Sequence, residues 1–403
     1  MMVNEEIMKS LAIQNESKIV LLVADGIGDL PSKNNKTALQ TALIPNLDRL
    51  ASKSACGLTD PISCGITPGS GPAHLSLFGY DPIKYQIGRG VLEALGVGME
   101  LTPYDLACRG NFATLSEKGI IVDRRAGRIS TAINEKICEI MQDKIKQIGE
   151  VKVIVAPGKE HRFVVVFRGK NLEEDLSDAD PQIVGEKMKF AQPLKARAKK
   201  TAEVVNEFIK IATEVLKEHY PANTVLLRGF AKHPDLPTMN ELFKLTPAAI
   251  ATYPMYKGLA KLVGMEILKT GESIKEEFET LRENFEKYDF FYLHIKKTDS
   301  YGEDGNFEEK VKIIEEVDKF IPEVLKLKPD VLVVTGDHST PAIMKGHSWH
   351  PNPFILFSPY IRIDDVDRFN EKACAQGELG RFAAVDALPL MMANALKLNK
   401  FGA

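Results

Sequence analysis

The sequence predicts an α/β fold in which a parallel-rich sheet is sandwiched by helices and carries a smaller inserted α+β domain. Apolar runs of strand length alternate with amphipathic helical segments, which implies parallel strands joined by right-handed crossovers. The chain of 403 residues is also longer than one typical core. A stretch in the middle departs from the alternation and has short strand-like runs around one helix.

The predicted core starts with the apolar run KIVLLVA at 18–24, which is typical of a strand buried on both faces. A helix is predicted over 36–54. Further strands are predicted at 224–228, 290–295, 331–335 and 354–357. Helical patterns separate most of these strands, at 202–218, 273–287, 307–327 and 382–398. The core domain is therefore expected to contain residues 1–107 and 191–403.

The predicted insertion covers residues 108–190. Its expected strands are 111–115, 151–155 and 163–167, and its expected helix is 134–148. Residues 171–182 are acidic and then contain proline, as in a surface return. No repeat or low-complexity tract interrupts either part.

Composition narrows the class of protein. The formal net charge is −3, so no overall basic field favours nucleic acid. No apolar run reaches the roughly 18 residues of a membrane span, and 1–17 lacks the apolar segment of a signal peptide. The five cysteines are odd in number and widely spaced, as in a reduced, cytoplasmic protein. We expect no nucleic-acid or membrane partner, and the sequence does not indicate an oligomeric state.

The stretch 65–75, GITPGSGPAHL, places Ser70 between two glycines where a turn opens into a helix. Glycine lets a backbone approach a ligand closely, and Pro72 suits a first helical turn. Free N–H groups in such a turn can bind phosphate, so Ser70 would lie where a phosphoryl group is held. The alternative is an ordinary serine N-cap.

Metal-ligand side chains follow three of the predicted strands. Asp25 follows the first, Asp299 another, and Asp337 and His338 a third, with His347 nine residues further on. Ligands of parallel sheets bind at the carboxyl ends of the strands. Carboxylate and imidazole together suit Mn²⁺ or Zn²⁺, and carboxylates alone suit Mg²⁺. Two such cations could clamp a phosphoryl group.

Each of these residues also has a simpler interpretation. An aspartate after a strand is often a turn former or helix cap, and Asp337-His338 could form a plain turn. His294 falls inside an apolar run and is expected to be a buried, hydrogen-bonded histidine. The joint pattern is harder to explain in this way, because the candidates recur at the same end of successive strands.

At this point the chain resembles the archaeal-type cofactor-independent phosphoglycerate mutases of the alkaline-phosphatase superfamily. The resemblance covers nearly the whole chain. The matching motifs are VADG at 23–26, GSGPAH at 69–74, FGYDP at 78–82, GRG at 88–90, DRRAGR at 123–128, EHR at 160–162, YPMYKG at 253–258, KKTD at 296–299 with Gly305, GDHSTP at 336–341 and HSWHP at 347–351.

The resemblance implies a mechanism and a ligand set. Ser70 would take the phosphoryl group of 3-phosphoglycerate as a phosphoserine and return it to the 2-hydroxyl, without 2,3-bisphosphoglycerate. One metal would be held by Asp25, Ser70, Asp337 and His338. The other would be held by Asp299, His347 and the residue four after Asp299. Mn²⁺ is the expected ion, with Mg²⁺, Zn²⁺ and Co²⁺ as alternatives. A metal would also activate the serine hydroxyl, which is a poor nucleophile by itself.

The chain departs from the superfamily pattern at that last ligand, where histidine is usual and Glu303 stands here. Glu303 could bind the metal and make the site harder and more negative, or it could swing out and leave Asp304 or water in its place.

The insertion is expected to grip a small phosphorylated acid, because arginine forks match carboxylate and phosphate. The alternative is a solvated basic turn. The candidate substrate-binding residues are Arg89, Arg124, Arg125, Arg128, His161, Arg162 and Lys257.

Three functions are weighed. The first is the mutase reaction of glycolysis and gluconeogenesis. The second is another phosphoryl transfer on the same scaffold, by a phosphohydrolase or a homoserine-kinase-like transferase. The third is a metal-impaired binding protein, which the complete ligand set disfavours. An α/β-hydrolase is excluded because Gly69-Ser70-Gly71 is not G-x-S-x-G.

Overall fold

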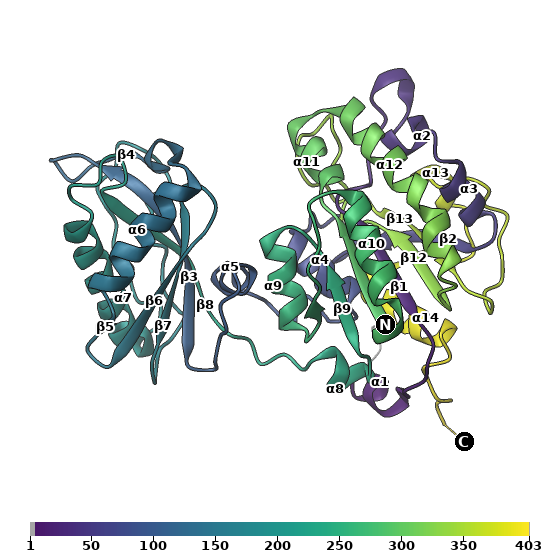
Figure 1. The fold of residues 1–403 in the computed structure, drawn as a ribbon, viewed down its shortest axis with the longest axis horizontal. Coiled ribbons are helices and arrows are strands. Elements are labelled where there is room, and N and C mark those ends of the chain that lie inside the picture. Colours follow the sequence, from purple (N-terminus) through teal and green to yellow (C-terminus); the bar gives the residue numbers. More distant parts are fainter. Residues whose placement is uncertain (1–4, 403) are drawn as a thin grey trace. The chain divides into compact units, whose positions relative to one another are not determined.

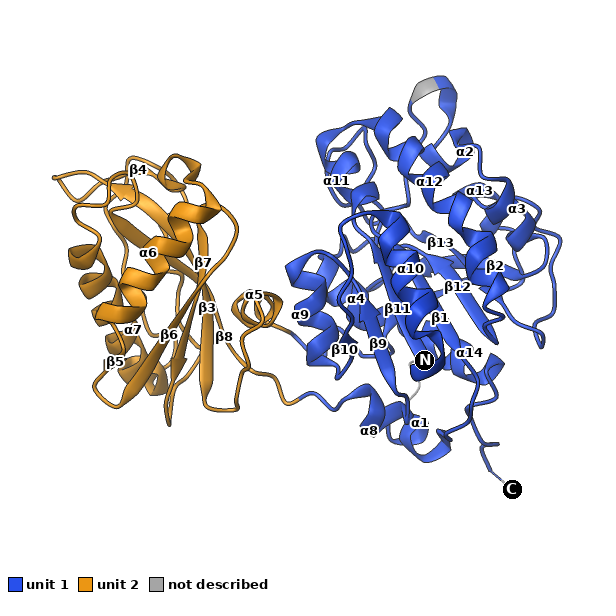
Figure 2. Cartoon of the chain, viewed as in Figure 1, with its two compact units in different colours: residues 1–86, 236–403 blue, residues 87–235 orange. Residues whose placement is uncertain are grey.

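The computed structural model describes residues 5–402, and the chain divides into two compact units (Figures 1 and 2). Unit 1 comprises Met1–Gln86 and Leu236–Ala403, and unit 2 comprises Ile87–Asp235. The inserted unit is thus wider on both sides than the expected 108–190. Within the described part of the chain, no helix is long and apolar enough to cross a membrane.

Among residues 5–402, eight strands form the sheet of unit 1, in the order β10–β9–β11–β1–β12–β13–β2–β14. Their bounds are β1 Ile19–Ala24, β2 Ala55–Asp60, β9 Pro247–Ile250, β10 Glu266–Ile267, β11 Phe290–Ile295, β12 Val331–Thr335, β13 Asn352–Phe357 and β14 Gly380–Ala383. All neighbours are parallel except at β13, which runs antiparallel to β12 and β2. Residues 336–351 join β12 to β13 without a crossover helix, so the chain reverses direction there. The predicted parallel-rich core is confirmed.

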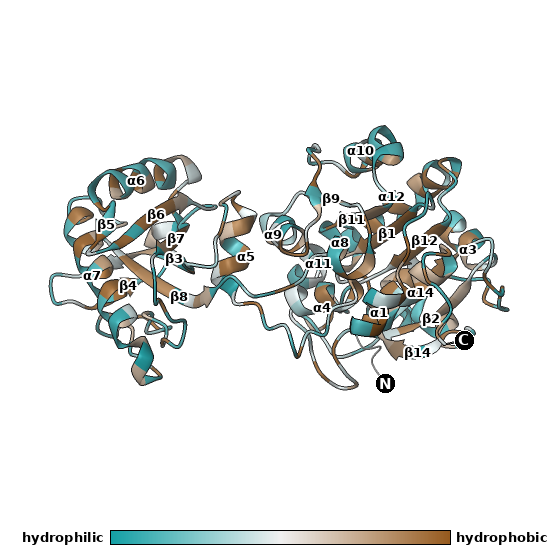
Figure 3. Ribbon diagram, turned by 90° about the horizontal axis from the view of Figure 1, so that it is seen from below, coloured by the Kyte–Doolittle hydropathy of each residue, from teal (hydrophilic) through white to brown (hydrophobic). Residues whose placement is uncertain are grey.

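Helices cover both faces of this sheet (Figure 1). They are α1 Glu5–Leu11, α2 Ala38–Thr41, α3 Pro45–Ala51, α4 Ser70–Leu77, α8 Met239–Phe243, α9 Pro254–Leu262, α10 Ile274–Asn284, α11 Lys297–Asp304, α12 Phe307–Lys326, α13 Glu371–Cys374 and α14 Ala387–Asn394, with 3₁₀ turns η1 Lys33–Asn35, η4 Phe285–Lys287 and η5 Ala384–Asp386. Leu22 of β1 belongs to the same buried cluster as Phe278 of α10 and Ile314 of α12. Tyr292 of β11 faces the other way and contacts His74 of α4. Hydrophobic residues accordingly gather on the strands (Figure 3).

Two predicted helices of unit 1 are shorter than expected. The helix predicted over 36–54 is divided into α2 and α3, because Pro45 starts a new helix. The helix predicted over 382–398 is reduced to α14, because its first residues pair with β2 as the edge strand β14.

Unit 2 is an antiparallel sheet covered by helices. Its strands are β3 Asp105–Leu115, β4 Ile121–Asp123, β5 Gln147–Ile148, β6 Val151–Pro157, β7 Arg162–Arg168 and β8 Thr224–Lys232. Its helices are α5 Arg89–Gly96, α6 Thr131–Lys144 and α7 Lys199–Val215, with 3₁₀ turns η2 Ala126–Arg128 and η3 Ala196–Ala198. The expected strands at 111–115, 151–155 and 163–167 lie in β3, β6 and β7.

The assignment of 202–218 and 224–228 to the core was wrong. The strand became β8, which pairs antiparallel with β3. The helix became α7, whose Phe208 packs on Phe167 of β7. An apolar run indicates a buried strand but not the sheet it joins, and this is why the predicted boundaries were too narrow.

Candidate active site

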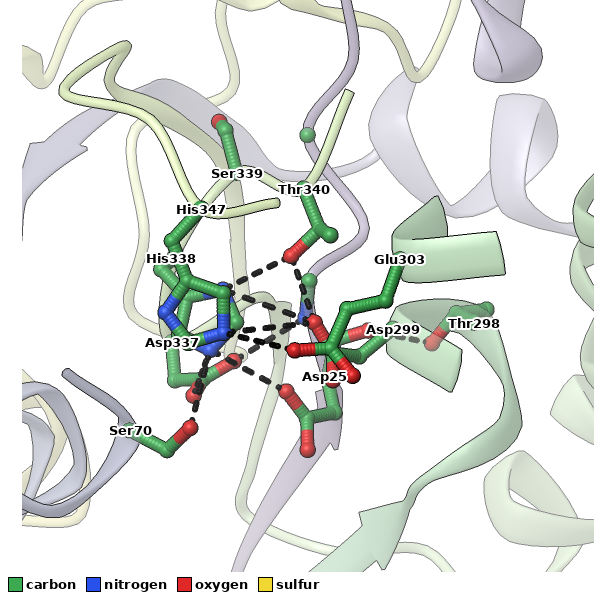
Figure 4. Close-up of polar contacts among 12 residues, drawn as sticks. Asp25, Ser70, Thr298, Asp299, Glu303, Asp337, His338, Ser339, Thr340 and His347 are labelled. Atoms are coloured by element: carbon green, nitrogen blue, oxygen red, sulfur yellow. Dashed lines mark hydrogen bonds and ion pairs between the residues drawn. The ribbon is translucent and has the colours of Figure 1, made fainter. Parts of the chain in front are cut away.

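Three neighbouring parallel strands of unit 1 end at one edge of the sheet, and an aspartate follows each. Asp25 comes directly after β1, Asp299 lies in the first turn of α11 after β11, and Asp337 comes two residues after β12. Since β1 lies between β11 and β12, the three carboxylates converge (Figure 4). This is the crevice that open α/β sheets use for ligands.

The first candidate metal group contains Asp25, Asp337 and His338, whose ligand atoms lie within 4.8 Å of one another. His338 Nε2 is 3.0 Å from Asp337 Oδ2 and 3.3 Å from Asp25 Oδ1. All three side chains are buried, and neither of these two carboxylate oxygens has a hydrogen-bond partner. Buried, unsatisfied carboxylate oxygens are costly. The group therefore fits a divalent cation bound through oxygen and nitrogen.

Ser70 is the first residue of α4 and not its N-cap, which is Gly69. The Ser70 hydroxyl makes no capping bond to the helix, and instead its Oγ lies 3.1 Å from His338 Nε2. The alternative of an ordinary serine N-cap is thus excluded by the geometry. The hydroxyl points at the first metal group, at the N-terminus of a helix that favours anions.

The second candidate group contains Asp299, His338 and His347, again with ligand atoms within 4.8 Å. His347 Nε2 lies 3.6 Å from Asp299 Oδ1 and 3.8 Å from Glu303 Oε1. Glu303 extends from α11 toward His347 (Figure 4), although its side chain is 54% exposed. The structure thus brings Glu303 to the edge of the group, on the same helix as Asp299.

Lys296 contributes a cation that we did not anticipate from the sequence. Its Nζ lies 3.1 Å from Asp25 Oδ2, donates to Asp299 Oδ2, and is 3.1 Å from the Tyr256 hydroxyl. It joins carboxylates from both metal groups. Lys296 stands inside the motif at 296–299, but a lysine after a strand gave no signal that distinguished it from a solvated residue.

Burial and internal charges set the protonation of the first group. Burial and the Asp337 carboxylate act to raise the pKa of Asp25, but Lys296, His294 and His338 outweigh them, so the pKa falls below its usual value. Burial also opposes ionisation of Asp337, yet His338 and His74 hold its pKa well below the usual range. For His338, burial favours the neutral form, but Asp337 and the other aspartates raise the pKa to about 9. The carboxylates are therefore ionised.

Two buried histidines support the aspartates from behind. His74 Nδ1 lies 2.8 Å from the Ser70 carbonyl oxygen and 3.2 Å from Asp337 Oδ2. His294 Nε2 lies 3.2 Å from Asp25 Oδ2, while its Nδ1 has no partner. The expectation that His294 is buried holds, but only one of its ring nitrogens is hydrogen-bonded.

Unit 2 contains a basic cavity of about 240 Å³. Its lining residues are Arg109, Asn111, Arg124, Arg125, Arg128, Glu160, His161, Arg162 and Arg228. The expected cluster of three arginines with His161 and Arg162 is therefore gathered in one place. Arg109 and Arg228 were missed, because they lie within strands whose neighbours could not be inferred from the sequence.

The members of this cavity differ in whether their nitrogens are already bound. Arg124 donates to both carboxylate oxygens of the buried Asp180 and to the Gln182 carbonyl oxygen. In contrast, Nε of Arg109 and Nε of Arg162 are buried without a partner, as is His161 Nδ1, although Nη1 of Arg109 donates to Glu93 Oε1 at 3.3 Å. This contrast favours a supporting role for Arg124 over the direct substrate contact that we expected.

His161 is held neutral in this basic surrounding. Burial and the neighbouring Arg162 lower its pKa to about 4. Arg89 does not line the cavity but lies on α5 of unit 2, where its Nε is 3.6 Å from Glu93 Oε1. The same oxygen lies 3.3 Å from Nη1 of Arg109, which does line the cavity. Lys257 lies on α9 of unit 1 and is half-buried.

Comparisons with known proteins identify the family. A family model described as "2,3-bisphosphoglycerate-independent phosphoglycerate mutase" matches residues 51–223. Two curated relatives carry the name "Probable 2,3-bisphosphoglycerate-independent phosphoglycerate mutase". The one from Thermosipho melanesiensis is 56% identical over 99% of both chains, and the one from Thermotoga maritima is 55% identical over 99% of both. The chain belongs to this family.

Solved structures give the same result for the fold of this phosphoglycerate mutase family member. A protein of Pyrococcus horikoshii has a TM-score of 0.83 and 31% identity, covering 97% of this chain and 100% of its own. The cofactor-independent phosphoglycerate mutase of Thermoplasma acidophilum has a TM-score of 0.76 and 32% identity, covering 94% of this chain and 100% of its own. The fold and family expected from the sequence motifs are thus confirmed.

Proposed function

We propose that this phosphoglycerate mutase family member interconverts 3-phosphoglycerate and 2-phosphoglycerate through a phosphoserine at Ser70. The observation that carries the proposal is the Ser70 hydroxyl, which lies 3.1 Å from His338 Nε2 at the junction of two metal-ligand groups. A helix N-terminus and two adjoining ligand groups are what a covalent phosphoryl transfer needs.

The ligand atoms divide between two divalent cations. We propose Asp25, Ser70, Asp337 and His338 for one, and Asp299, Glu303 and His347 for the other. When bound, such cations neutralise phosphoryl oxygens and lower the pKa of a coordinated hydroxyl. Mn²⁺ is the expected ion, with Mg²⁺, Zn²⁺ and Co²⁺ as alternatives, since the set mixes carboxylate and imidazole.

The reaction balances without a second phosphoryl donor. The Ser70 hydroxyl loses its proton, its Oγ forms a bond to phosphorus, and the bond from phosphorus to the 3-oxygen of glycerate breaks. The 3-oxygen takes up a proton in exchange. The 2-hydroxyl of the same glycerate then loses its proton and attacks phosphorus, the Oγ–phosphorus bond breaks, and Ser70 Oγ takes up a proton, so that no proton is gained or lost overall. The Lys296 ammonium can stabilise the negative charge that develops during these steps, because it already lies between Asp25 and Asp299.

The basic cavity of unit 2 is proposed to bind the anionic substrate. Buried arginine nitrogens without a partner require an acceptor, and planar carboxylate or phosphate oxygens match them. Neutral His161 adds a hydrogen-bonding group that can serve a glycerate hydroxyl. A mutase needs such a grip because glycerate must stay bound while the phosphoserine exists, and water must be kept away.

One assay tests the proposal and separates it from a phosphohydrolase. Protein freed of metal with a chelator is given 3-phosphoglycerate with and without Mn²⁺, and both 2-phosphoglycerate and free phosphate are measured. We expect 2-phosphoglycerate only when the cation is present, with little free phosphate. Free phosphate as the main product would indicate a hydrolase, and full activity in protein shown to be metal-free by elemental analysis would contradict the metal proposal.

A further inference from the structure

Lys310 is a fully buried lysine on α12, a helix that contributes no proposed metal ligand or substrate contact. Its Nζ donates to the carbonyl oxygens of Gly28 at 3.1 Å and Thr340 at 2.8 Å. It also lies 3.7 Å from Asp29 Oδ2, and the side chains of Lys310 and Asp29 are both 0% exposed. A lysine ammonium is almost never fully buried unless it is paired, because its desolvation is costly. The two carbonyl oxygens and Asp29 offset this cost, so the ammonium holds these three groups together.

The two carbonyl acceptors belong to the loops that follow β1 and β12, which carry Asp25 and Asp337-His338. The loops lie against each other, since a Cβ added at Gly28 would overlap the Ser339 hydroxyl. The Thr340 N–H also donates to the Gly28 carbonyl oxygen at 3.0 Å. One ammonium thus fixes the backbone of both loops from their buried side.

Thr340 transmits this placement to the metal ligands. Its hydroxyl donates to Asp299 Oδ1 at 2.6 Å and lies 3.0 Å from His338 Nδ1 (Figure 4). Because the hydroxyl has a single proton, it accepts from the Nδ1–H of His338. That bond leaves His338 Nε2 directed at Ser70 and the two aspartates.

Asp29 and Glu371 complete the surroundings of the ammonium. Asp29 Oδ2 has no hydrogen-bond partner, while Asp29 Oδ1 accepts from the Ala342 N–H at 3.1 Å. Glu371 Oε1 accepts from the Asp29 N–H at 3.0 Å. Burial lowers the pKa of Lys310, and the carboxylates of Asp29 and Glu371 oppose that shift. Two carbonyl oxygens and a carboxylate are also the ligands that a bare monovalent cation such as K⁺ takes in place of water.

We propose that Lys310 is a positioning residue whose ammonium serves as a built-in cation and fixes the geometry of both metal-ligand groups through the Gly28 and Thr340 carbonyl oxygens. The inference rests on the proposed two-metal site. It adds that the site depends on a second ammonium besides Lys296, one that contacts the backbone of the ligand loops and not the ligand carboxylates. Removing that charge should therefore loosen the binding of divalent cations even in protein that remains folded.

The first test replaces Lys310 by methionine, which keeps much of the side-chain length but removes the ammonium. We expect the affinity of the folded, substrate-free protein for Mn²⁺ to fall by about 10- to 100-fold, the range for residues that orient metal ligands. The visible spectrum of the Co²⁺-loaded protein should change as well, because it reports coordination geometry. Lys312→Met is the matched control, since Lys312 is two residues away, is 65% exposed and pairs with Glu309.

The second test uses chemical rescue. Lys310→Ala leaves room for a small cation, so ethylammonium or K⁺ at high concentration should restore part of the lost Mn²⁺ affinity. Choline, which is cationic but too large and has no N–H donor, should not. Equal recovery of Mn²⁺ affinity with all three cations would show an effect of ionic strength. It would overturn the proposal that Lys310 serves as a built-in cation.

A third variant covers the case in which Lys310 variants do not fold. Thr340→Val removes only the hydroxyl, and it should weaken Mn²⁺ binding about tenfold or more while the protein stays folded. Wild-type Mn²⁺ affinity and an unchanged Co²⁺ spectrum, in folded Lys310→Met or in Thr340→Val, would overturn the inference. Failure of the proposed function is recognised separately, because it would show as wild-type protein that binds no divalent cation or forms no 2-phosphoglycerate.

Discussion

The candidate metal site of unit 1 and the basic cavity of unit 2 differ in how far their charges are balanced within the protein. In unit 1 the carboxylates already have internal cations, since Lys296 bridges Asp25 and Asp299 and His338 contacts Asp337. In unit 2 Arg109 and Arg162 keep nitrogens that are buried and unpaired. Unit 1 also keeps Asp25 Oδ1 and Asp337 Oδ2 without a hydrogen-bond partner, but its charges are largely paired internally. The cavity of unit 2 is lined by six arginines and one glutamate, so its excess positive charge is left for an anion to balance.

This difference indicates which region carries out the chemical step and which region binds the substrate. A pre-organised site loses little free energy in rearranging during the reaction. A cavity whose arginines keep unpaired nitrogens gains most when a charged partner of matching shape binds. We therefore expect changes in unit 1 to affect the chemical step and metal binding, and changes in unit 2 to affect substrate retention.

The largest expected effect follows from Ser70→Ala. Loss of the nucleophile and of one metal ligand should lower turnover by at least about a thousandfold, as when other covalent catalysts are deleted. Wild-type protein incubated with substrate should carry phosphate on Ser70, which mass spectrometry can detect. Ser76→Ala is the control on the same helix, because that hydroxyl only donates to the Pro61 carbonyl oxygen. Near-normal turnover in Ser70→Ala would contradict the proposal that unit 1 carries out the chemical step through Ser70.

Arg162→Ala should have the next largest effect, and it should act on substrate retention and not on the nucleophile. Truncating an arginine that pairs with a buried anion costs about 2–5 kcal/mol, which is about 30-fold or more in affinity. Because glycerate would be held less well, the share of phosphoryl groups lost to water should also rise. Arg128→Ala should act in the same direction. The measurement is 2-phosphoglycerate and free phosphate in one reaction.

Arg124 and Arg197 sharpen this prediction. Arg124→Ala should mainly lower the free energy of unfolding, because it removes both guanidinium hydrogen bonds from the buried Asp180 carboxylate and leaves only Arg228, at 3.7 Å, as its cation. Arg197→Ala removes a surface ion pair with Asp175. It should change neither the free energy of unfolding nor the partition between mutase and hydrolysis. If Arg162→Ala and Arg128→Ala keep the wild-type rate and partition between mutase and hydrolysis, the cavity is only a basic surface.

The sequence predicted the unit 1 site better than the unit 2 cavity, and the two sheets explain why. In a parallel sheet the residues after successive strands meet at one edge, so Asp25, Asp299 and Asp337 could be placed together from their positions alone. In the antiparallel sheet of unit 2, cavity residues come from mid-strand positions such as Arg109 and Arg228. Their meeting depends on strand register, which an apolar pattern does not reveal. Lys310 was missed for a related reason, because it stands on the buried side of a helix where apolar residues are usual.

Binding of the metal should become tighter as the pH rises toward 9. The pKa of His338 in metal-free protein is raised to about 9 from its usual 6.5, mainly by Asp337, against the effect of burial. A proton therefore competes with the metal at Nε2, and affinity should change by about tenfold per pH unit below pH 9. The same proton stabilises the metal-free fold fully below pH 6.5, and this stabilisation is lost as the pH rises through 9.

Titration calorimetry with Mn²⁺ in buffers of different ionisation enthalpy measures both the affinity and the released proton. We expect about one proton released from His338 near pH 7.5 and about a quarter of a proton at pH 9.5. Ligand binding in unit 2 should not follow this profile, because the pKa of His161 is lowered to about 4. Mn²⁺ affinity that does not vary between pH 6.5 and 9 would show that His338 is not a ligand.

The smallest expected effect concerns Glu303, where the chain has a carboxylate instead of the histidine expected from the superfamily pattern. Its Oε1 lies 3.8 Å from His347 Nε2, and its side chain is half-exposed, so it can approach a bound ion without disturbing the buried ligands. Because carboxylate favours harder cations than imidazole does, Glu303→His should shift preference from Mg²⁺ toward Mn²⁺ or Zn²⁺. We expect a change in the affinity ratio of about tenfold, or about 1.4 kcal/mol, with activity retained. Asp304→His is the matched control, since Asp304 is the exposed next residue of α11. An unchanged ratio in both variants would show that Glu303 is an exposed neighbour of the site and that water completes the coordination of the second metal. An equal or larger shift in Asp304→His would assign that place to Asp304.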